Sequence, residues 1–408
     1  MTMSQSLLGR LFLSVVFGTQ LSCATTDLPP IKENSSFLLE EDGEKRLWSE
    51  AEAFEHKLAK SGLLFQDESL NGYLLTVLQR LLPQGIETSK LSPRIQIIRN
   101  PFLNGFAMPN GLICLNSGLL TRMETEDQLA AVIGHELIHF THRHGLKQAR
   151  DSANKEIASK VVGALFRTAT VGSGYTPDIA IWWTGGWILA SLQGYSRELE
   201  AEADTGSYGL ITKAGYDPLQ VIRLFEMLQQ DLGEYKSEEP FFYGTHPMLQ
   251  ERIDNYRNLI GFQGPSHQSS AQTHHETLQK KLFALYLANA ELDLEIGRLN
   301  AARSAIEKHL AMQPRSARAY YLLGEAHRRR GRDAADIQQA LSAYQAAIDV
   351  DPKYPEPHRE IGMIFRILKR EDDAREEFER YLSLSSSAPD APIIKGFMKE
   401  ASSRKESR

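Results

Sequence analysis

The chain has only two cysteines among its 408 residues, Cys23 and Cys114, and Cys23 lies close to the N-terminus. A disulfide framework and a cysteine-rich zinc site are therefore excluded. The net charge is also small, −6, and the 46 lysines and arginines are scattered along the chain. Because a nucleic-acid-binding protein needs a basic patch or stripe, we expect no nucleic-acid partner.

Long apolar runs are scarce as well. Residues 11–21 form an apolar segment after Arg10 that is too short to span a membrane, and small residues around Cys23 suit signal cleavage. We therefore predict a signal peptide over residues 1–24. Lipidation of Cys23 is an open alternative, although Gln20 stands where lipoprotein signals usually have an aliphatic residue. In both cases the mature protein leaves the cytoplasm.

The most informative motif is the HExxH sequence at residues 135–139. Residues four apart share one face of a helix, so His135 and His139 can offer two imidazole nitrogens to one metal ion. Zinc suits such ligands, and a catalytic zinc keeps one position open for a water molecule, whose proton Glu136 can accept. Apolar flanks at helical spacing and a capping box at Thr125 predict a helix. The alternative is a core helix with two surface histidines.

Two further histidines, His142 and His144, follow the motif. The metzincin pattern requires a glycine and a third histidine three and six residues after His139, but those positions hold His142 and Gly145. The metzincin pattern therefore fails. We expect His142 and His144 to be solvated rather than to bind the metal.

An acidic segment at residues 196–204 can supply the third ligand that the motif needs. Glu200 and Asp204 lie four residues apart, so they share one helix face. Glu200 can bind the metal while Asp204 holds a ligand histidine from behind. Glu198 and Glu202 compete for the ligand position, and a solvated acidic helix face is the alternative.

Alternating apolar residues predict a strand at 94–99, and residues 104–116 predict a β-hairpin with its turn at 109–111. We expect the strand just before the metal helix to form an exposed sheet edge. Such an edge binds an extended peptide by adding a strand. An ordinary covered hairpin fits the sequence equally well.

An uncharged run over residues 179–196 contains three tryptophans, Trp182, Trp183 and Trp187. Its glycines argue against a transmembrane helix. We expect a helical segment that covers the active site or touches a membrane surface through its tryptophans.

The C-terminal part of the chain repeats. After a predicted linker at 261–278, Pro314, Pro352 and Ser386 recur at intervals of 38 and 34 residues, close to the tetratricopeptide repeat (TPR) period of about 34. We predict TPR units over 279–387 and a capping helix with a frayed tail over 388–408. Stacked helix pairs leave a concave surface that can bind a peptide or a protein partner.

Residues 37–260 resemble the BepA/HtpX-type zinc metallopeptidases, a family of HExxH gluzincins. The matching blocks are Asn104-Gly-Phe-Ala-Met-Pro-Asn-Gly111, His135-Glu136-Leu-Ile-His139, Ser196-Arg-Glu-Leu-Glu200 with Ala203-Asp204, and Thr245-His246-Pro247 with Arg252. Gly105 is a departure, because relatives often have alanine there. The resemblance, together with the repeats, implies an α+β fold: a mostly helical zincin-type metallopeptidase domain (28–260) with a small β-sheet, followed by an all-α TPR solenoid.

The resemblance also implies a site. One Zn²⁺ per chain would be held by His135, His139 and Glu200. His246 would be a fourth ligand at rest or would stabilise the tetrahedral intermediate, and Arg252 would be the oxyanion partner. The substrate would lie extended along a strand formed by Asn104, Gly105, Phe106, Ala107 and Met108.

Relatives that combine both parts are periplasmic and act in outer-membrane protein assembly and quality control. The resemblance therefore implies a metalloendopeptidase of the periplasm, either free or anchored to the outer membrane as a lipoprotein. Glu136 would be the general base, and the substrates would be misfolded or stalled outer-membrane proteins. The TPR array would bind substrate or a partner, such as the outer-membrane assembly machinery. The rival hypothesis is a TPR-based chaperone or assembly scaffold whose zinc site is silent or self-inhibited.

Overall fold

The computed structural model describes residues 28–31, 42–83, 92–154, 195–234, 249–263 and 271–406. The predicted signal peptide with Cys23, the three tryptophans of the uncharged run, and His246 lie outside these ranges. None of the helices within the described ranges is long and apolar enough to cross a membrane.

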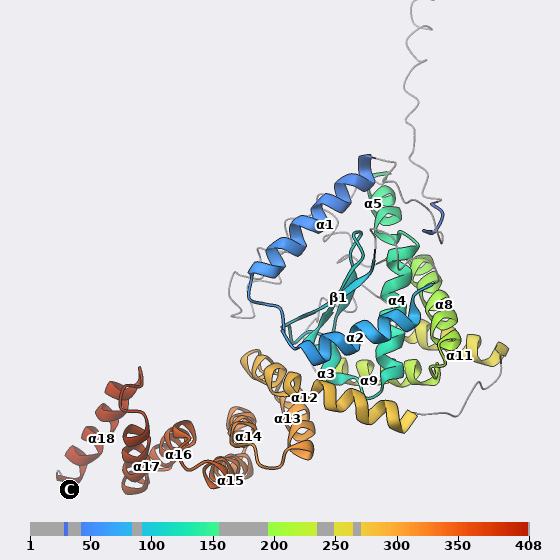
Figure 1. Cartoon of the computed structure of the whole chain (residues 1–408). Coiled ribbons are helices and arrows are strands. Elements are labelled where there is room, and N and C mark those ends of the chain that lie inside the picture. Colours follow the sequence, from blue (N-terminus) through green and yellow to red (C-terminus); the bar gives the residue numbers. More distant parts are fainter. Residues whose placement is uncertain are drawn as a thin grey trace, which may run out of the picture.

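The N-terminal part of the described chain is mostly helical and surrounds a small three-stranded sheet (Figure 1). This arrangement agrees with the predicted α+β fold. Its elements are α1 (Asp42–Lys60), α2 (Glu68–Leu81), β1 (Arg94–Ile98), β2 (Gly105–Ala107), β3 (Leu112–Asn116), α3 (Ser117–Arg122), α4 (Glu126–Thr141), α5 (His144–Asn154), α8 (Arg197–Lys213), α9 (Leu219–Glu234) and α11 (Leu249–Gln263).

The strand order in the sheet is β1-β3-β2, with β1 parallel and β2 antiparallel to β3. The predicted hairpin is present: Phe106 lies opposite Cys114, and the turn closes at Gly111, whose φ of 81° favours glycine. The expected sheet edge is the first strand of the hairpin, β2, and not the second, β3. β3, the strand before the metal helix, is central because β1 pairs along its other side, and all five of its residues are buried. The strand at the hairpin edge of the sheet is therefore β2.

Helix α4 carries the HExxH motif through the middle of this part of the protein. The Thr125 side chain accepts a hydrogen bond from the Gln128 N–H, as the predicted cap requires. All 16 residues of α4 except Val132 are buried. The alternative of two surface histidines on a core helix is therefore wrong, because both histidines lie inside.

Helices α4 and α8 pack side by side (Figure 1), and glycines allow the close approach. A Cβ atom added at Gly206 of α8 would lie 2.7 Å from Ile138 Cδ1, and one at Gly134 of α4 would lie 2.9 Å from Ser207 Oγ. The buried face of α8 carries Glu200 and Asp204. The tight packing therefore brings these two carboxylates to the HExxH face of α4.

The C-terminal part consists of helix pairs that extend away from the peptidase part (Figure 1). The helices are α12 (Ala271–Glu295), α13 (Leu299–Met312), α14 (Ala317–Arg330), α15 (Ala334–Val350), α16 (Pro355–Ile367), α17 (Glu371–Leu384) and α18 (Ala391–Glu406). Pairs α12–α13, α14–α15 and α16–α17 form the three predicted repeats, and α18 packs on the last pair. Gly324 and Gly362 lie at the helix crossings, where a Cβ would meet the rings of Tyr344 and Phe378 at 2.4 and 2.6 Å.

Both ends of the predicted linker at 261–278 are helical. Helix α11 continues to Gln263 and α12 begins at Ala271. The glycine-, serine- and histidine-rich composition of the segment 261–278 indicated a loop. Its last residues instead form the start of α12, which buries Leu278 and Leu282. These leucines belong to one hydrophobic cluster that also includes α2, α4 and α9, so the first repeat shares the peptidase core.

Candidate metal centre

Three buried side chains converge between α4 and α8. His135, His139 and Glu200 each offer one ligand atom, and these atoms all lie within 4.8 Å of one another. The two histidine Nε2 atoms are 2.9 Å apart, and the Glu200 carboxylate oxygens lie 3.4 Å from His135 Nε2 and 3.5 Å from His139 Nε2. Among the described residues, no other group of three or more histidine, cysteine, aspartate or glutamate side chains meets this spacing.

The geometry and charge of this cluster fit a zinc ion. Bonds of about 2.0–2.1 Å in a tetrahedral site place neighbouring ligand atoms roughly 3.3 Å apart. The observed separations bracket that value. Although burial and Arg252 oppose protonation, hydrogen bonds with Asp204 and Glu200 raise the pKa of His135 to about 9. The cluster therefore favours a positive charge at this position, and a metal cation satisfies the same preference.

Glu136 follows His135 directly on α4 and is 2% exposed. Its charge acts on Tyr195, whose ring stacks on His139. The carboxylate of Glu136 therefore belongs to the same small region as the ligand cluster, without being one of its three members.

His135 is held from behind by Asp204 and Arg252. Asp204 Oδ1 lies 3.0 Å from His135 Nδ1, on the ring side opposite the Nε2 that faces the cluster. Arg252 donates to both oxygens of Asp204, at 2.7 Å from Nη2 and 3.0 Å from Nε, and its guanidinium lies over the Phe225 ring. Burial would raise the pKa of Asp204, but the charge of Arg252 and the hydrogen bond from His135 lower it, so Asp204 stays ionised.

Arg252 also approaches the cluster itself: its Nη2 is 3.1 Å from His135 Nδ1, and its Nη1 forms an ion pair with Glu200 Oε2 at 3.7 Å. Its predicted contact with a substrate oxyanion stays a prediction. The predicted role of His246 also stays a prediction, because that residue lies outside the described ranges.

His139 is held from behind by His144. The two Nδ1 atoms are 2.9 Å apart, and the His144 side chain is completely buried. The prediction that His144 is solvated is therefore wrong. Helix α4 ends at Thr141, and Arg143 has a positive φ of 58°, which turns the chain back so that His144 lies against His139. His142 is partly buried.

Burial, with a smaller contribution from His139, lowers the pKa of His144 to about 2, so its imidazole is neutral at physiological pH. A neutral imidazole has one nitrogen that donates and one that accepts. His144 can therefore accept a hydrogen bond at Nδ1.

Tyr195 covers one face of the His139 ring, with ring centroids 3.9 Å apart and an interplanar angle of 17°. Burial raises the pKa of Tyr195, and the charges of Glu136 and Glu200 raise it further, so the phenol stays neutral. Sequence reasoning missed Tyr195. It directly precedes the 196–204 segment, but nothing in the pattern marks it.

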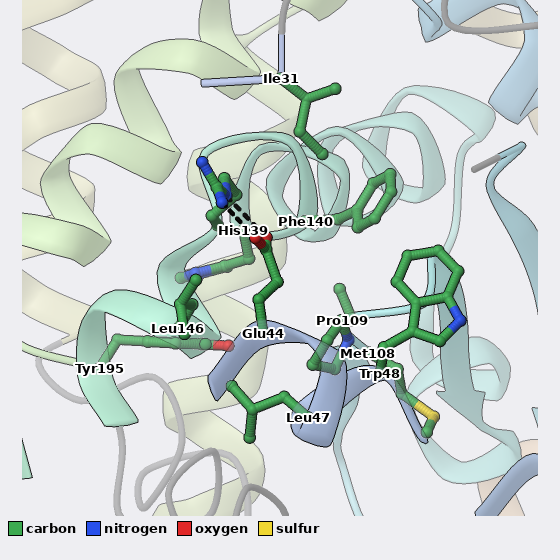
Figure 2. Close-up of a pocket in the computed structure, with 13 residues that line it drawn as sticks. Ile31, Glu44, Leu47, Trp48, Met108, Pro109, His139, Phe140, Leu146 and Tyr195 are labelled. Atoms are coloured by element: carbon green, nitrogen blue, oxygen red, sulfur yellow. Dashed lines mark hydrogen bonds and ion pairs between the residues drawn. The ribbon is translucent and has the colours of Figure 1, made fainter. Parts of the chain in front are cut away.

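A pocket opens beside His139 and Tyr195 at the end of strand β2 (Figure 2). Glu44 of α1 crosses it to pair with Arg143. Because the pair is bidentate, the two charges neutralise each other, and the remaining wall is mostly apolar. The apolar side chains of the wall are Ile31, Leu47, Trp48, Ala107, Met108, Pro109, Phe140 and Leu146.

Comparisons with known proteins agree with this geometry. Residues 68–260 match peptidase family M48, and they contain the whole ligand cluster. The metalloprotease LoiP of Escherichia coli strain K12 is 30% identical over 193 residues, which cover 47% of this chain and 71% of LoiP. The chain belongs to peptidase family M48. The M48 part is followed by matches to the tetratricopeptide repeat over residues 287–339 and 332–392.

Two longer relatives of this M48 chain carry a more specific name. The beta-barrel assembly-enhancing protease of Escherichia coli strain K12 is 26% identical over 257 residues, 62% of this chain and 49% of the relative. The protease of the same name from Yersinia pestis is 26% identical over 249 residues, 60% of this chain and 49% of the relative. The M48 chain thus spans about half the length of these relatives.

Proposed function

We propose that this chain is a zinc-dependent metalloendopeptidase that cleaves unfolded or misfolded polypeptides. The observation that carries the proposal is the convergence of two histidines and a glutamate, His135, His139 and Glu200, beside Glu136. Two imidazoles and one carboxylate are a ligand set of catalytic zinc sites, which leave a fourth position for water.

Each residue of the site has a defined role in this proposal. When bound, Zn²⁺ supplies a Lewis acid and lowers the pKa of a water molecule towards neutrality. Glu136 accepts the proton of the attacking water and then returns it to the leaving amine. Asp204 and Arg252 hold His135 in one tautomer and one orientation. His246 is proposed to approach the metal as a fourth ligand at rest or as a partner of the tetrahedral intermediate.

The substrate is proposed to add a strand to β2. Hydrogen bonds from Met108 N–H to Leu112 O and from Asn116 N–H to Asn104 O show that the even-numbered residues of this segment face β3. In an antiparallel pair the intervening residues point the other way. The backbone of Ala107 therefore faces outward, where an extended peptide can pair with it. An unfolded segment supplies such an extended peptide readily.

The pocket beside His139 is proposed to hold the substrate side chain next to the scissile bond (Figure 2). Its apolar wall and neutralised ion pair favour an apolar side chain. Its volume is about 30 Å³. Since a single water molecule needs roughly 10–15 Å³ measured in this way, the pocket suits a small residue.

The proposal extends to the compartment and the partner. The predicted signal peptide and the name of the longer relatives support action in the periplasm, free or anchored through Cys23, on proteins destined for the outer membrane. The TPR array is proposed to bind substrate or an assembly partner. A groove between α14 and α15, lined by Tyr320, Leu323 and His327, could bind a peptide and so supports the alternative hypothesis of a chaperone or scaffold.

The test uses purified mature protein. Bound zinc and the cleavage of unfolded casein are measured for the wild type, Glu136→Gln and His246→Ala, with Glu198→Gln on the exposed side of α8 as a matched control. We expect about one zinc per chain in the wild type, Glu136→Gln and Glu198→Gln, with cleavage reduced by about 10²–10⁴-fold in Glu136→Gln and unchanged in Glu198→Gln. Slower cleavage by His246→Ala would identify a histidine that stabilises the intermediate. Faster cleavage by His246→Ala would identify a self-inhibiting histidine. A purified protein without zinc would contradict the proposal, and zinc binding without any cleavage would favour the scaffold hypothesis.

A further inference from the structure

The two ligand histidines have different hydrogen-bond partners behind them. His135 has Asp204, whereas His139 has His144, which has no role in the mechanism so far. His139 Nε2 faces His135 Nε2 at 2.9 Å, so this nitrogen is the one that points to the metal position. When Nε2 coordinates a metal, the ring hydrogen of His139 must reside on Nδ1. That Nδ1–H donates to His144 Nδ1, 2.9 Å away.

The acceptor role fixes the tautomer of His144. With Nδ1 accepting, its hydrogen must sit on Nε2. Glu202 Oε2 lies 3.3 Å from that atom without the alignment of a hydrogen bond, so its negative charge, rather than a hydrogen bond, favours the Nε2–H form. Glu202 Oε2 is also 3.4 Å from Lys147 Nζ, so its charge is balanced by an ammonium group. The chain of contacts therefore runs from the metal position through His139 and His144 to Glu202 and Lys147.

We propose that His144 and Glu202 are positioning residues that fix the tautomer and orientation of the metal ligand His139. They would act on His139 as Asp204 and Arg252 act on His135. This inference rests on the proposed metal-dependent function.

The same arrangement explains the acidic run of α8. Glu200 faces the metal position, Asp204 lies behind His135, and Glu202 lies behind His144. Glu202 is thus a partner of the second histidine rather than a rival ligand. It does not form a second metal site with His142, because His142 Nε2 is 3.8 Å from Glu202 Oε1 and Lys147 already neutralises the carboxylate.

Packing leaves His139 little freedom besides this hydrogen bond. Tyr195 stacks on one face of its ring, and the His144 ring meets it edge-on, with centroids 4.8 Å apart and an interplanar angle of 80°. Replacing His144 therefore removes two things, an acceptor and a volume. The test must separate them.

The variants are His144→Leu, His144→Asn and Glu202→Gln, with His142→Leu as the matched control two residues away. Leucine fills space without accepting a hydrogen bond, whereas the side-chain oxygen of asparagine takes roughly the place of Nδ1 and can accept from His139. The zinc affinity of each purified full-length protein is measured by competition with a chelator. The absorption spectrum of the Co²⁺-loaded protein reports ligand geometry, and circular dichroism checks the fold.

We expect His144→Leu to weaken zinc binding by about 10–100-fold and to alter the cobalt spectrum. His144→Asn should recover most of the affinity, Glu202→Gln should lose less than His144→Leu, and His142→Leu should match the wild type. Wild-type affinity and spectrum in folded His144→Leu would overturn the inference, as would equal loss in His144→Asn and His144→Leu. Since zinc affinity is read without cleavage, a wild type that binds zinc but cleaves nothing refutes only the peptidase, whereas a wild type without zinc refutes both.

Discussion

Ser117 Oγ donates a hydrogen bond to Asn289 Oδ1 at 2.7 Å, and both side chains are completely buried. Ser117 begins α3, directly after the central strand of the peptidase sheet, and Asn289 lies on α12, the first helix of the repeats. Arg298 Nη1 reinforces this junction by donating to Pro101 O at 2.8 Å. The first repeat is therefore an integral part of the peptidase, although its sequence marks it as the start of a separate array.

Truncation tests this junction. A chain of residues 1–314 keeps α12 and α13, whereas a chain of residues 1–270 loses them. Removing α12 exposes a face of the core that Leu278, Leu282 and Leu285 cover, each worth roughly 1.5–3 kcal/mol of burial. We expect the longer chain to melt cooperatively and to bind zinc, and the shorter chain to do neither, as measured by circular dichroism and metal analysis. A cooperative transition at the same temperature in both chains would show that the repeats are independent of the peptidase.

Arg252 should matter for stability as well as for the metal. Arg252→Met leaves the ionised Asp204 buried without its counter-charge, which typically costs about 3–5 kcal/mol. The free energy of unfolding in urea and the zinc affinity should both fall. Arg257→Met, on the exposed side of the same helix, removes two surface pairs, with Glu226 at 3.2 Å and with Asp254 at 3.3 Å, and should cost about 1 kcal/mol or less. Similar losses of unfolding free energy in the two variants would mean that the buried pair contributes no more to stability than the surface pairs.

Two glycines of α8 provide a matched pair for the packing against α4. Gly206→Ala places a methyl group 2.7 Å from Ile138 Cδ1, so α8 must shift away from the HExxH helix, at a cost of about 1–3 kcal/mol. Gly209→Ala meets no atom within 4 Å and should stabilise the helix by up to about 1 kcal/mol. Thermal unfolding of both variants measures the difference. Because Gly206 lies two residues from Asp204, zinc affinity should fall in the first variant alone; equal affinities would mean that α8 can shift without disturbing its ligand.

The sequence predicted those features that depend on local spacing. Residues four apart put His135 and His139 on one face, the cap at Thr125 started α4, and the glycine-containing turn at 109–111 produced the hairpin. Glu200 was preferred over Glu202 by resemblance to a family pattern, since both sit on the same acidic run.

Local spacing could not predict the features that depend on contacts between distant segments or on a reversal of the chain direction. β3 is central only because β1, from a separate part of the chain, pairs with its far side. His144 is buried only because Arg143 adopts a left-handed conformation, which is rare for residues other than glycine and asparagine. The helical turns at 271–278 have the composition of a linker, yet they lead into the helix that closes the peptidase core.

The last prediction concerns the choice of substrate residue. Leu47 and Leu58 are both leucines of α1 in one apolar cluster, 3% and 2% exposed, but Leu47 alone lines the pocket beside His139. Each change to alanine removes similar burial and should lower stability by about 2–5 kcal/mol. Only Leu47→Ala enlarges the pocket, so it should shift cleavage of unfolded casein from small apolar residues towards leucine and phenylalanine, mainly through a lower KM. Mapping of cleaved bonds by mass spectrometry reads the preference directly. If the two variants cut at the same bonds as the wild type, the pocket does not select the substrate residue, even though cleavage that depends on Glu136 would still identify a peptidase.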